Sequence, residues 1–329
     1  MSEIGKRVVV VGAGITGLSA AAAARDLGMS VTVIDDARPS RATYAAAGML
    51  APYSEAIVGD GELGAQMVEA LSLWDSWRRG LQVPDELFEF VPTKFVPATF
   101  GDRQEIARWA RDAGLELVES AQGLQGPLEA LTEPRELVRH VREQLLDLGV
   151  VFVDGVVSRV TETDDSVVVA RDGAESISGD LGLIATGASS VVADDSLLIR
   201  PVRGSLVVLD GPARNEPQVA RVLRHGRPLY VIWRRSGEIV IGATSVETSL
   251  NVAEAGEVQV MLSDAIETFP ELRQLPFREV RTGLRPTATS NTLNSRVSAH
   301  GRYLQLAGHY RHGILMAPLS SRRVREFLA

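Results

Sequence analysis

The stretch "RVVVVGAGITG", residues 7–17, decides the fold of this chain. Its apolar run predicts a fully buried strand, and the small residues at 14–27 predict a helix that ends at Gly28. "VTVID" at 31–35 predicts a second buried strand. A strand, a helix and a strand in this order predict the opening of a parallel α/β sheet.

Three glycines of this stretch, "GAGITG" at 12–17, match the pattern G-x-G-x-x-G. Gly12 permits a tight turn, Gly14 lets the backbone approach a pyrophosphate, and Gly17 lets helix and strand pack closely. The helix N-terminus stabilises the phosphate charge, and Asp35 is expected to accept hydrogen bonds from the adenosine ribose. The alternative is a glycine-rich turn without a ligand, but the strand, helix and acidic residue around it favour a dinucleotide.

A second literal match, "GDGELG" at 59–64, predicts no nucleotide site. No buried strand leads into it, and the carboxylates of Asp60 and Glu62 would repel a pyrophosphate. Acidic residues are favourable near a helix N-terminus, so the segment predicts a loop and a helix start. Enzymes that use FAD and NAD(P)H together usually need two nucleotide loops, and this chain has one.

Beyond this opening, helix-rich ends flank a strand-rich middle. Helices are predicted over 61–80, 134–149 and near 256–268, and from about Gly313 onward. Short apolar or alternating segments between 150 and 173 predict a meander in which a strand pair is attached to the first sheet. Further strands are predicted within 181–189, 204–210, 228–234, 237–244 and 302–308. This pattern predicts a nucleotide-binding domain interrupted by a mostly antiparallel domain.

Composition excludes several classes of function. The 329 residues carry a formal net charge of -8, which argues against a nucleic-acid partner. The chain has no cysteine, so disulfides, thiolate catalysis and cysteine-linked cofactors are excluded, and a cytoplasmic location is expected. The N-terminal apolar run superficially suits a signal peptide, but glycines break it, and no other segment reaches the ~20 apolar residues that span a bilayer.

The choice between FAD and NAD depends on more than the glycine loop. "RATYAAAGMLAP" at 41–52 is a run of small residues around Gly48. Its backbone could lie against a flat ring system, or the run could be a tightly packed helix start. The chain resembles the glycine oxidases of thiamine biosynthesis, within the D-amino acid oxidase family of FAD-dependent oxidoreductases. The motifs that carry this resemblance, in the same order, are "GAGITG", "AAAGMLAP", "LIATGA", "PVRG", "VIGAT", "GLRP" and "GHYRHGILMAP".

The resemblance implies an α/β fold in which a Rossmann-like FAD-binding domain is interrupted by a mostly antiparallel substrate domain. It implies FAD-binding segments 1–86, 135–200 and 297–329, and substrate-domain segments 87–134 and 201–296. FAD would be held non-covalently, because no cysteine is present. Relatives commonly form tetramers, so a homo-oligomer is expected.

The resemblance also implies an activity, the oxidative deamination of a small, glycine-like amine or amino acid. Hydride passes to flavin N5, the imine hydrolyses, and dioxygen is reduced to hydrogen peroxide. Two alternatives keep the fold: a dehydrogenase that passes electrons to another acceptor, and a specialised secondary-metabolite amine oxidase with an altered pocket. An NAD-binding protein is a third alternative, which the single nucleotide loop disfavours.

Four residues are expected in the substrate pocket by resemblance. Arg285 in "GLRP" would bind the substrate carboxylate, since a guanidinium matches it bidentately; a surface charge is the alternative. Tyr230 would assist with its hydroxyl, or be a core aromatic. Arg311 would lie near flavin and substrate. Ser245 takes a pocket-wall position that is often methionine in relatives, which makes the pocket more polar or roomier. The mechanism demands no general base.

The resemblance implies a larger set of cofactor contacts. The residues expected to contact FAD are Gly12, Gly14, Ile15, Thr16, Gly17, Asp35, Asp36, Arg41, Ala46, Ala47, Gly48, Met49, Val157, Ala185, Thr186, Gly187, Arg285, His309, Tyr310, Arg311, His312, Gly313 and Ile314. Three segments depart from the relatives: the chain is shorter between about 115 and 134, 287–297 lacks their usual pattern, and the tail is short. These departures leave the substrate open.

The tail segment "GHYRHGILMAP" at 308–318 predicts no metal site, because its flanking glycines indicate a loop and no third ligand is near. Partly exposed loop histidines are the plain alternative. A strand before it and a helix from Gly313 predict an anion-binding helix N-terminus at the flavin. Tyr310 and Arg311 would then face the substrate, while His309 and His312 shape the loop.

Overall fold

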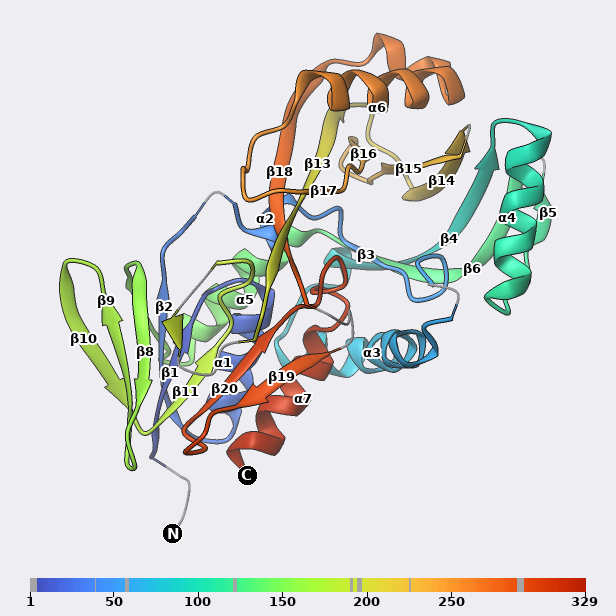
Figure 1. The fold of residues 1–329 in the computed structure, drawn as a ribbon. Helices are drawn as coiled ribbons and strands as arrows, with labels where there is room; N and C mark the ends of the chain where they lie inside the picture. The colour runs from blue at the N-terminus through green and yellow to red at the C-terminus, as the bar shows by residue number, and fades with distance from the viewer. Residues whose placement is uncertain are drawn as a thin grey trace.

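Two large sheets carry most of the chain in this computed structural model (Figure 1). The structure describes residues 5–38, 40–56, 59–120, 123–189, 192–193, 197–224, 226–288 and 293–329. Among these residues, no helix has the length and apolarity needed to cross a membrane.

The first sheet has six strands in the order β19-β20-β11-β1-β2-β7. Its strands are β1 (Arg7–Val11), β2 (Ser30–Asp35), β7 (Val151–Asp154), β11 (Leu181–Ile184), β19 (Asn294–Val297) and β20 (Tyr303–Ala307). All neighbours are parallel except β19 and β20, which are antiparallel. In the central strand, Val10 lies opposite Val33 on one side and Leu183 on the other. The predicted opening strand, helix and strand are therefore confirmed.

Both faces of this sheet are covered, which explains the unbroken apolar run of β1. Side chains alternate along a strand, so Val8 and Val10 enter one core while Val9 and Val11 enter another. The first core belongs to the helices α1 (Ile15–Asp26), α3 (Gly61–Gly80), α5 (Pro134–Asp147) and α7 (Ala317–Leu328). The second core belongs to a four-stranded sheet of β8 (Val157–Glu162), β9 (Val167–Arg171), β10 (Ala174–Gly179) and β12 (Val192–Ala193).

The predicted meander is partly correct. Strands β8 and β9 pair antiparallel, as the expected strand pair does, and β10 extends them. Strand β7 does not join them: it lies parallel to β2 at the edge of the first sheet, with Phe152 opposite Val33. A strand after a crossover helix continues a parallel sheet, and the helix before β7 is α5.

The second sheet is mostly antiparallel and has ten strands. These are β3 (Met49–Leu50), β4 (Phe88–Pro97), β5 (Val118–Ser120), β6 (Gly123–Thr132), β13 (Arg200–Asp210), β14 (Gln218–Arg224), β15 (Arg227–Trp233), β16 (Glu238–Gly242), β17 (Val246–Glu247) and β18 (Phe277–Thr287). The helix α6 (Ala255–Thr268) covers its outer face, packing Met261 and Ala265 against the strands (Figure 1). The inner face remains for the site.

Shorter elements complete the described chain. They are the helices α2 (Ala42–Ala45) and α4 (Phe100–Asp112) and the 3-10 helices η1 (Asp85–Leu87) and η2 (Pro270–Gln274). The helix predicted from Gly313 begins instead at Ala317. The reason is Pro318, which is tolerated in the first turn but would clash with the Ile314 carbonyl deeper in a helix.

The fold class is confirmed: a Rossmann-like sheet and a mostly antiparallel sheet alternate along the chain. The domain limits remain a prediction. Two short strands lie across them, since β3 belongs to the antiparallel sheet and β19 to the parallel one.

Candidate active site

One cavity of about 590 Å³ has walls from both large sheets. The loop after β1 and the carboxyl end of β2 line one end, and strands β14, β15, β16 and β18 line the other. Every predicted site residue lines it except Gly17 and His312. The structure therefore brings the predicted residues together, while the role of each remains a prediction.

The glycine loop at the first end shows three different needs for glycine. Gly12 has φ 101, and a Cβ there would lie 2.4 Å from the Ala185 carbonyl oxygen. A Cβ on Gly17 would lie 1.8 Å from the Gly12 carbonyl oxygen, so helix and strand touch at this point. Gly14 is open: its nearest neighbour would be Thr43 Oγ1, at 3.5 Å. This open approach in front of the α1 N-terminus fits a pyrophosphate.

Acidic and basic groups lie beside the loop. Asp35 Oδ1 accepts a hydrogen bond from the Ala13 N–H at 3.0 Å, and the other carboxylate oxygen pairs with Arg41. Arg38, which the sequence reasoning missed, lines the cavity and donates to Ser189 Oγ at 2.9 Å. These groups can bind the ribose and phosphate of a dinucleotide.

The small-residue segment combines the two structures considered for it. The short helix α2 ends at Ala45, and the backbone then runs extended through Ala46 and Ala47 along the cavity. Gly48 has φ 81, and a Cβ there would lie 2.1 Å from the Thr132 carbonyl oxygen. The segment thus presents flat backbone, with only methyl-sized side chains, to the cavity.

At the other end, two sheet glycines make room for the two predicted carboxylate-binding side chains. A Cβ on Gly204 would lie 2.2 Å from Arg285 Cζ, and one on Gly242 would lie 2.4 Å from Tyr230 Oη. Arg285 donates to the Thr244 carbonyl oxygen at 2.9 Å. Burial raises the pKa of Tyr230 to about 12, so its hydroxyl keeps its proton and can donate.

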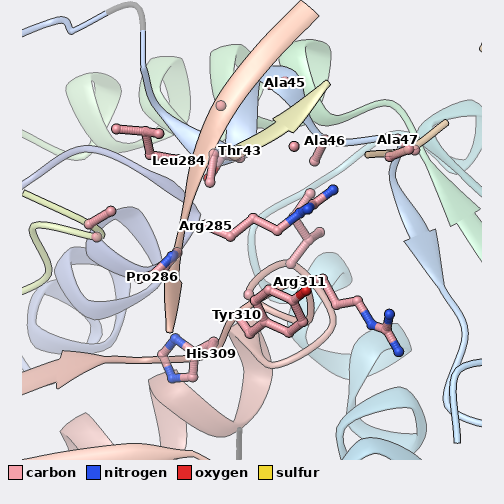
Figure 2. A pocket seen from close by; sticks show the side chains of 18 of the residues that line it. Thr43, Ala45, Ala46, Ala47, Leu284, Arg285, Pro286, His309, Tyr310 and Arg311 are labelled. Carbon is pink, nitrogen blue, oxygen red and sulfur yellow. The ribbon is translucent and has the colours of Figure 1, made fainter. Parts of the chain in front are cut away.

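The tail segment reaches the same part of the cavity. Figure 2 shows Tyr310 and Arg311 beside Arg285, with the small side chains of α2 and the residues after it nearby. Tyr310 has φ 48, donates its N–H to the Pro286 carbonyl at 2.7 Å, and shares a 2.8 Å hydrogen bond with Ser245 Oγ. The guanidinium groups of Arg285 and Arg311 lie 5.9 and 5.8 Å from its ring.

A buried carboxylate that the sequence reasoning missed, Glu55, holds this end together. Its Oε1 accepts from Arg221 at 2.9 Å, and its Oε2 lies 3.0 Å from Arg311 Nε and 3.5 Å from His312 Nδ1. Burial alone would raise the pKa of Glu55, but the charges of Arg221 and Arg311 lower it to about 2. Glu55 therefore holds Arg311 at the cavity wall. The sequence predicted a place for Arg311 near the flavin but not this ion pair.

The two histidines are buried, which contradicts the alternative of partly exposed loop histidines. His309 and His312 are 2% and 3% exposed. Burial lowers the pKa of both to about 4, so both rings are neutral at pH 7. His309 lines the cavity, and its Nε2 has no hydrogen-bond partner among the described residues. A buried polar atom left in this state fits a ligand that supplies its partner.

The cavity as a whole fits FAD. Its nucleotide end offers the open approach at Gly14 and the acid at Asp35, and its middle offers flat backbone at 46–48. The cavity wall also includes His309, whose Nε2 has no hydrogen-bond partner among the described residues. The turn at Gly313 and Ile314 also lines the cavity, just before α7 begins, although the regular helix starts four residues later than predicted.

The missed residues had weak sequence signals. Arg221 is a charged residue between the buried Ala220 and Val222, which marks a strand face that is not a plain core. Glu55 lies in a loop after "GMLAP", and only the folded chain brings it to Arg221 and Arg311.

Comparisons with known proteins identify the family of this chain. The family described as FAD dependent oxidoreductase matches residues 7–326. The bifunctional protein ThiO/ThiG of Nostoc sp. is 30% identical over 98% of this chain, and the chain spans 52% of that relative's length. The glycine oxidase of Pseudomonas aeruginosa is 28% identical, with 100% of this chain and 95% of that protein covered.

A solved structure shares the fold. The glycine oxidase from Geobacillus kaustophilus superposes with a TM-score of 0.83 at 21% identity, covering 98% of this chain and 95% of that one. The suspected resemblance is thus confirmed at the level of the family. Because the family match covers almost the whole chain, the chain belongs to the FAD dependent oxidoreductase family, and its cofactor is FAD.

Proposed function

We propose that the chain oxidatively deaminates a small amine or amino acid that binds between Arg285 and the flavin. The substrate Cα–H bond breaks and its electron pair leaves as hydride, while the nitrogen loses a proton and a C=N bond forms. Water hydrolyses this imine to a carbonyl compound and ammonia. When bound, FAD supplies the two-electron chemistry, and dioxygen takes up the electrons with two protons to give hydrogen peroxide.

One observation carries the proposal: Arg285 and Tyr230 both lie over sheet glycines at the end of the cavity away from the nucleotide loop. A guanidinium can bind a carboxylate with two parallel hydrogen bonds, and Tyr230 can donate a third. Such a clamp would fix the substrate Cα relative to the flavin ring. Fixing two reactants in the reacting geometry can supply a large part of the rate enhancement.

In this mechanism no side chain of the chain has to take a proton from the substrate. His309 and His312 are neutral at pH 7, and Tyr230 keeps its proton, so none of the three is a strong base there. The substrate ammonium proton can leave to water before the Cα–H bond breaks. Catalysis is then mainly orientation and electrostatics, as in the sequence-based expectation.

The turn at Gly313 and Ile314 is the third part of the proposal. It lines the cavity and leads into α7, a 12-residue helix whose N-terminal end carries partial positive charge. That end would stabilise negative charge on the flavin ring in its reduced form. Trp74 of α3 donates to the Leu315 carbonyl at 3.0 Å, which fixes the turn in place.

The test is a peroxide-coupled assay of the purified, FAD-loaded protein across glycine, sarcosine, both enantiomers of the common amino acids and simple amines. We expect peroxide with at least one of them, matched by an equal amount of ammonia from a primary amine or of the released amine from sarcosine. Substrate loss without peroxide, in the presence of a quinone acceptor, would identify a dehydrogenase instead. No turnover with any of them under either condition would contradict the amine oxidation proposed here.

A further inference from the structure

The cavity extends beyond the carboxylate clamp along the inner face of the antiparallel sheet. Phe95 in β4 lies opposite Arg221 in β14, and Arg221 lies opposite Tyr230 in β15. Residues directly opposite each other on paired strands point to the same face. Neighbouring strands are about 4.8 Å apart, so Phe95 lies roughly 10 Å from Tyr230 along this row.

The far end of this row, which we call the outer lobe, is lined by Phe95, Ile106, Trp109, Leu223 and Pro228, and the exposed Glu105 next to Ile106 also lines the cavity. Phe95 and Ile106 are only 4% and 5% exposed and pack with Leu124, so the wall is firmly held. Trp109 and Leu223 are half-buried members of the same cluster, and both line the cavity.

The aromatic pair of this lobe presents apolar surface. The rings of Phe95 and Trp109 have centroids 5.4 Å apart at 45°. The indole N–H of Trp109 is already used, since it donates to the Ala56 carbonyl oxygen at 3.2 Å. The ring therefore offers its apolar faces to whatever enters the lobe.

Arg221 lies between the clamp and the outer lobe, and it shares the Glu55 carboxylate with Arg311. Glu55 accepts its hydrogen bond at 2.9 Å, and both side chains are largely buried, at 18% and 13% exposed. A paired guanidinium keeps its flat faces, which stack well on aromatic rings. A planar apolar group can therefore stack over Arg221 while this ion pair stays in place.

We propose that the outer lobe binds an aryl-sized apolar side chain of the substrate, so that the preferred substrate is a bulky apolar amino acid and not glycine. The inference rests on the proposed function, because the clamp at Arg285 sets where the side chain starts. Each methylene buried in such a lobe strengthens binding about fourfold. Glycine would bind at the clamp but has no side chain to occupy the outer lobe.

The lobe is tested first by binding, which does not depend on turnover. Acetate, 3-methylbutanoate and phenylacetate are titrated into the FAD-loaded protein while the flavin absorbance is followed. We expect Kd to fall at least tenfold from acetate to phenylacetate. Equal or rising Kd values along this series would overturn the inference and make the lobe only a solvent path to the clamp.

Two variants locate the effect. Leu223→Trp fills the lobe and should remove the gain for phenylacetate while leaving acetate within twofold. Leu117→Trp is the matched control, because Leu117 is a half-buried member of the same cluster that does not line the cavity. If Leu223→Trp does not fold, Leu223→Asn replaces it, with the same loss expected. An unchanged preference in a folded Leu223 variant also overturns the inference.

Turnover separates the two proposals. Peroxide assays with glycine, alanine, leucine and phenylalanine, in both enantiomers, should give kcat/KM at least tenfold higher for phenylalanine than for glycine. If no substrate turns over but Kd still falls with probe size, the oxidase proposal fails and the outer lobe stands. If glycine is the best substrate and Kd is independent of size, the outer lobe fails and the oxidase proposal stands.

Discussion

The two ends of the cavity are built in opposite ways. At the nucleotide end, Gly12, Gly14 and Gly17 lie within six residues, and the backbone itself forms the binding surface. At the clamp end, Tyr230 in β15 and Arg285 in β18 line one cavity only because β16 and β13 join their strands in one sheet. The first end depends on local conformation, whereas the second depends on the register of a long-range sheet.

The effect that reaches furthest, because it removes the cofactor itself, is expected from breaking the local end with Gly17→Ala. The added Cβ would lie 1.8 Å from the Gly12 carbonyl oxygen, so loop and helix must separate. Overpacking of this kind costs about 1–3 kcal/mol, and here it also displaces the proposed pyrophosphate site. We expect at least a tenfold drop in bound FAD per mole of protein, measured by flavin absorbance after reconstitution.

Gly64→Ala is the control for this prediction, because Gly64 belongs to the second literal match of the same pattern. It lies inside α3, and no atom would come within 4 Å of its Cβ. We expect unchanged FAD content and up to about 1 kcal/mol of added stability from the better helix former. Loss of FAD in Gly64→Ala alone would mean that the two matches had been assigned the wrong way round.

This contrast explains what the sequence could predict. The loop after β1 was predictable because strand, turn and helix are consecutive, and the rejected match does form a helix start, with Asp60 accepting from the Leu63 N–H at 3.2 Å. The start of α7 was predicted four residues too early, although Pro318, which restricts it, is visible in the sequence. Glu55 was not, because its partners Arg221 and Arg311 lie far along the chain and a single sequence carries no register between them.

At the clamp end, Arg285→Ala is expected to reduce activity far more strongly than FAD content. Removing one partner of a buried charge-assisted pair costs about 2–5 kcal/mol, which corresponds to roughly 30-fold to several thousandfold in kcat/KM. Gly204→Ala tests the same site without removing the charge, since its Cβ would lie 2.2 Å from Arg285 Cζ and push the guanidinium aside. We expect it to raise KM more than it lowers kcat.

Arg200→Ala is the matched control, because Arg200 lies on the same strand as Gly204. Its guanidinium forms an exposed ion pair with Glu247. Exposed pairs contribute at most about 1 kcal/mol, so its kinetics should match those of the unmodified protein. If Arg285→Ala keeps full activity on every amino acid substrate, Arg285 does not hold the carboxylate.

The acid stability of the protein is expected to reveal the buried ionisable groups of the clamp end. The pKa of Glu55 falls from 4.5 to about 2 on folding, so its contribution is complete above pH 4.5 and is lost as the pH falls through 2. This contribution amounts to about 3 kcal/mol. Urea unfolding of Glu55→Gln should therefore lose less stability between pH 4.5 and 2 than the unmodified protein does.

The histidines act in a separate pH range. His309 and His312 have ordinary pKa values of 6.5, lowered to about 4 by burial. The unfolded chain therefore binds these protons first, and the folded protein loses stability as the pH falls from 6.5 to 4. His309→Asn should make the loss in this range smaller and leave the range below it unchanged. A stability that is flat from pH 6.5 to 4 in the unmodified protein would contradict the burial of neutral histidines.

The smallest effect is expected where the clamp end reaches solvent. Ser245 Oγ and Tyr310 Oη share a hydrogen bond of 2.8 Å, with Ser245 exposed and Tyr310 half-buried. Such a bond contributes about 0.5–1.5 kcal/mol, so Ser245→Ala should change KM by no more than about tenfold, with FAD content and kcat retained. Because Tyr310 is also fixed by its N–H bond to the Pro286 carbonyl at 2.7 Å, its ring should keep its place. A collapse of kcat in Ser245→Ala would show that the hydroxyl acts on the substrate itself, and the clamp would then extend beyond Arg285 and Tyr230.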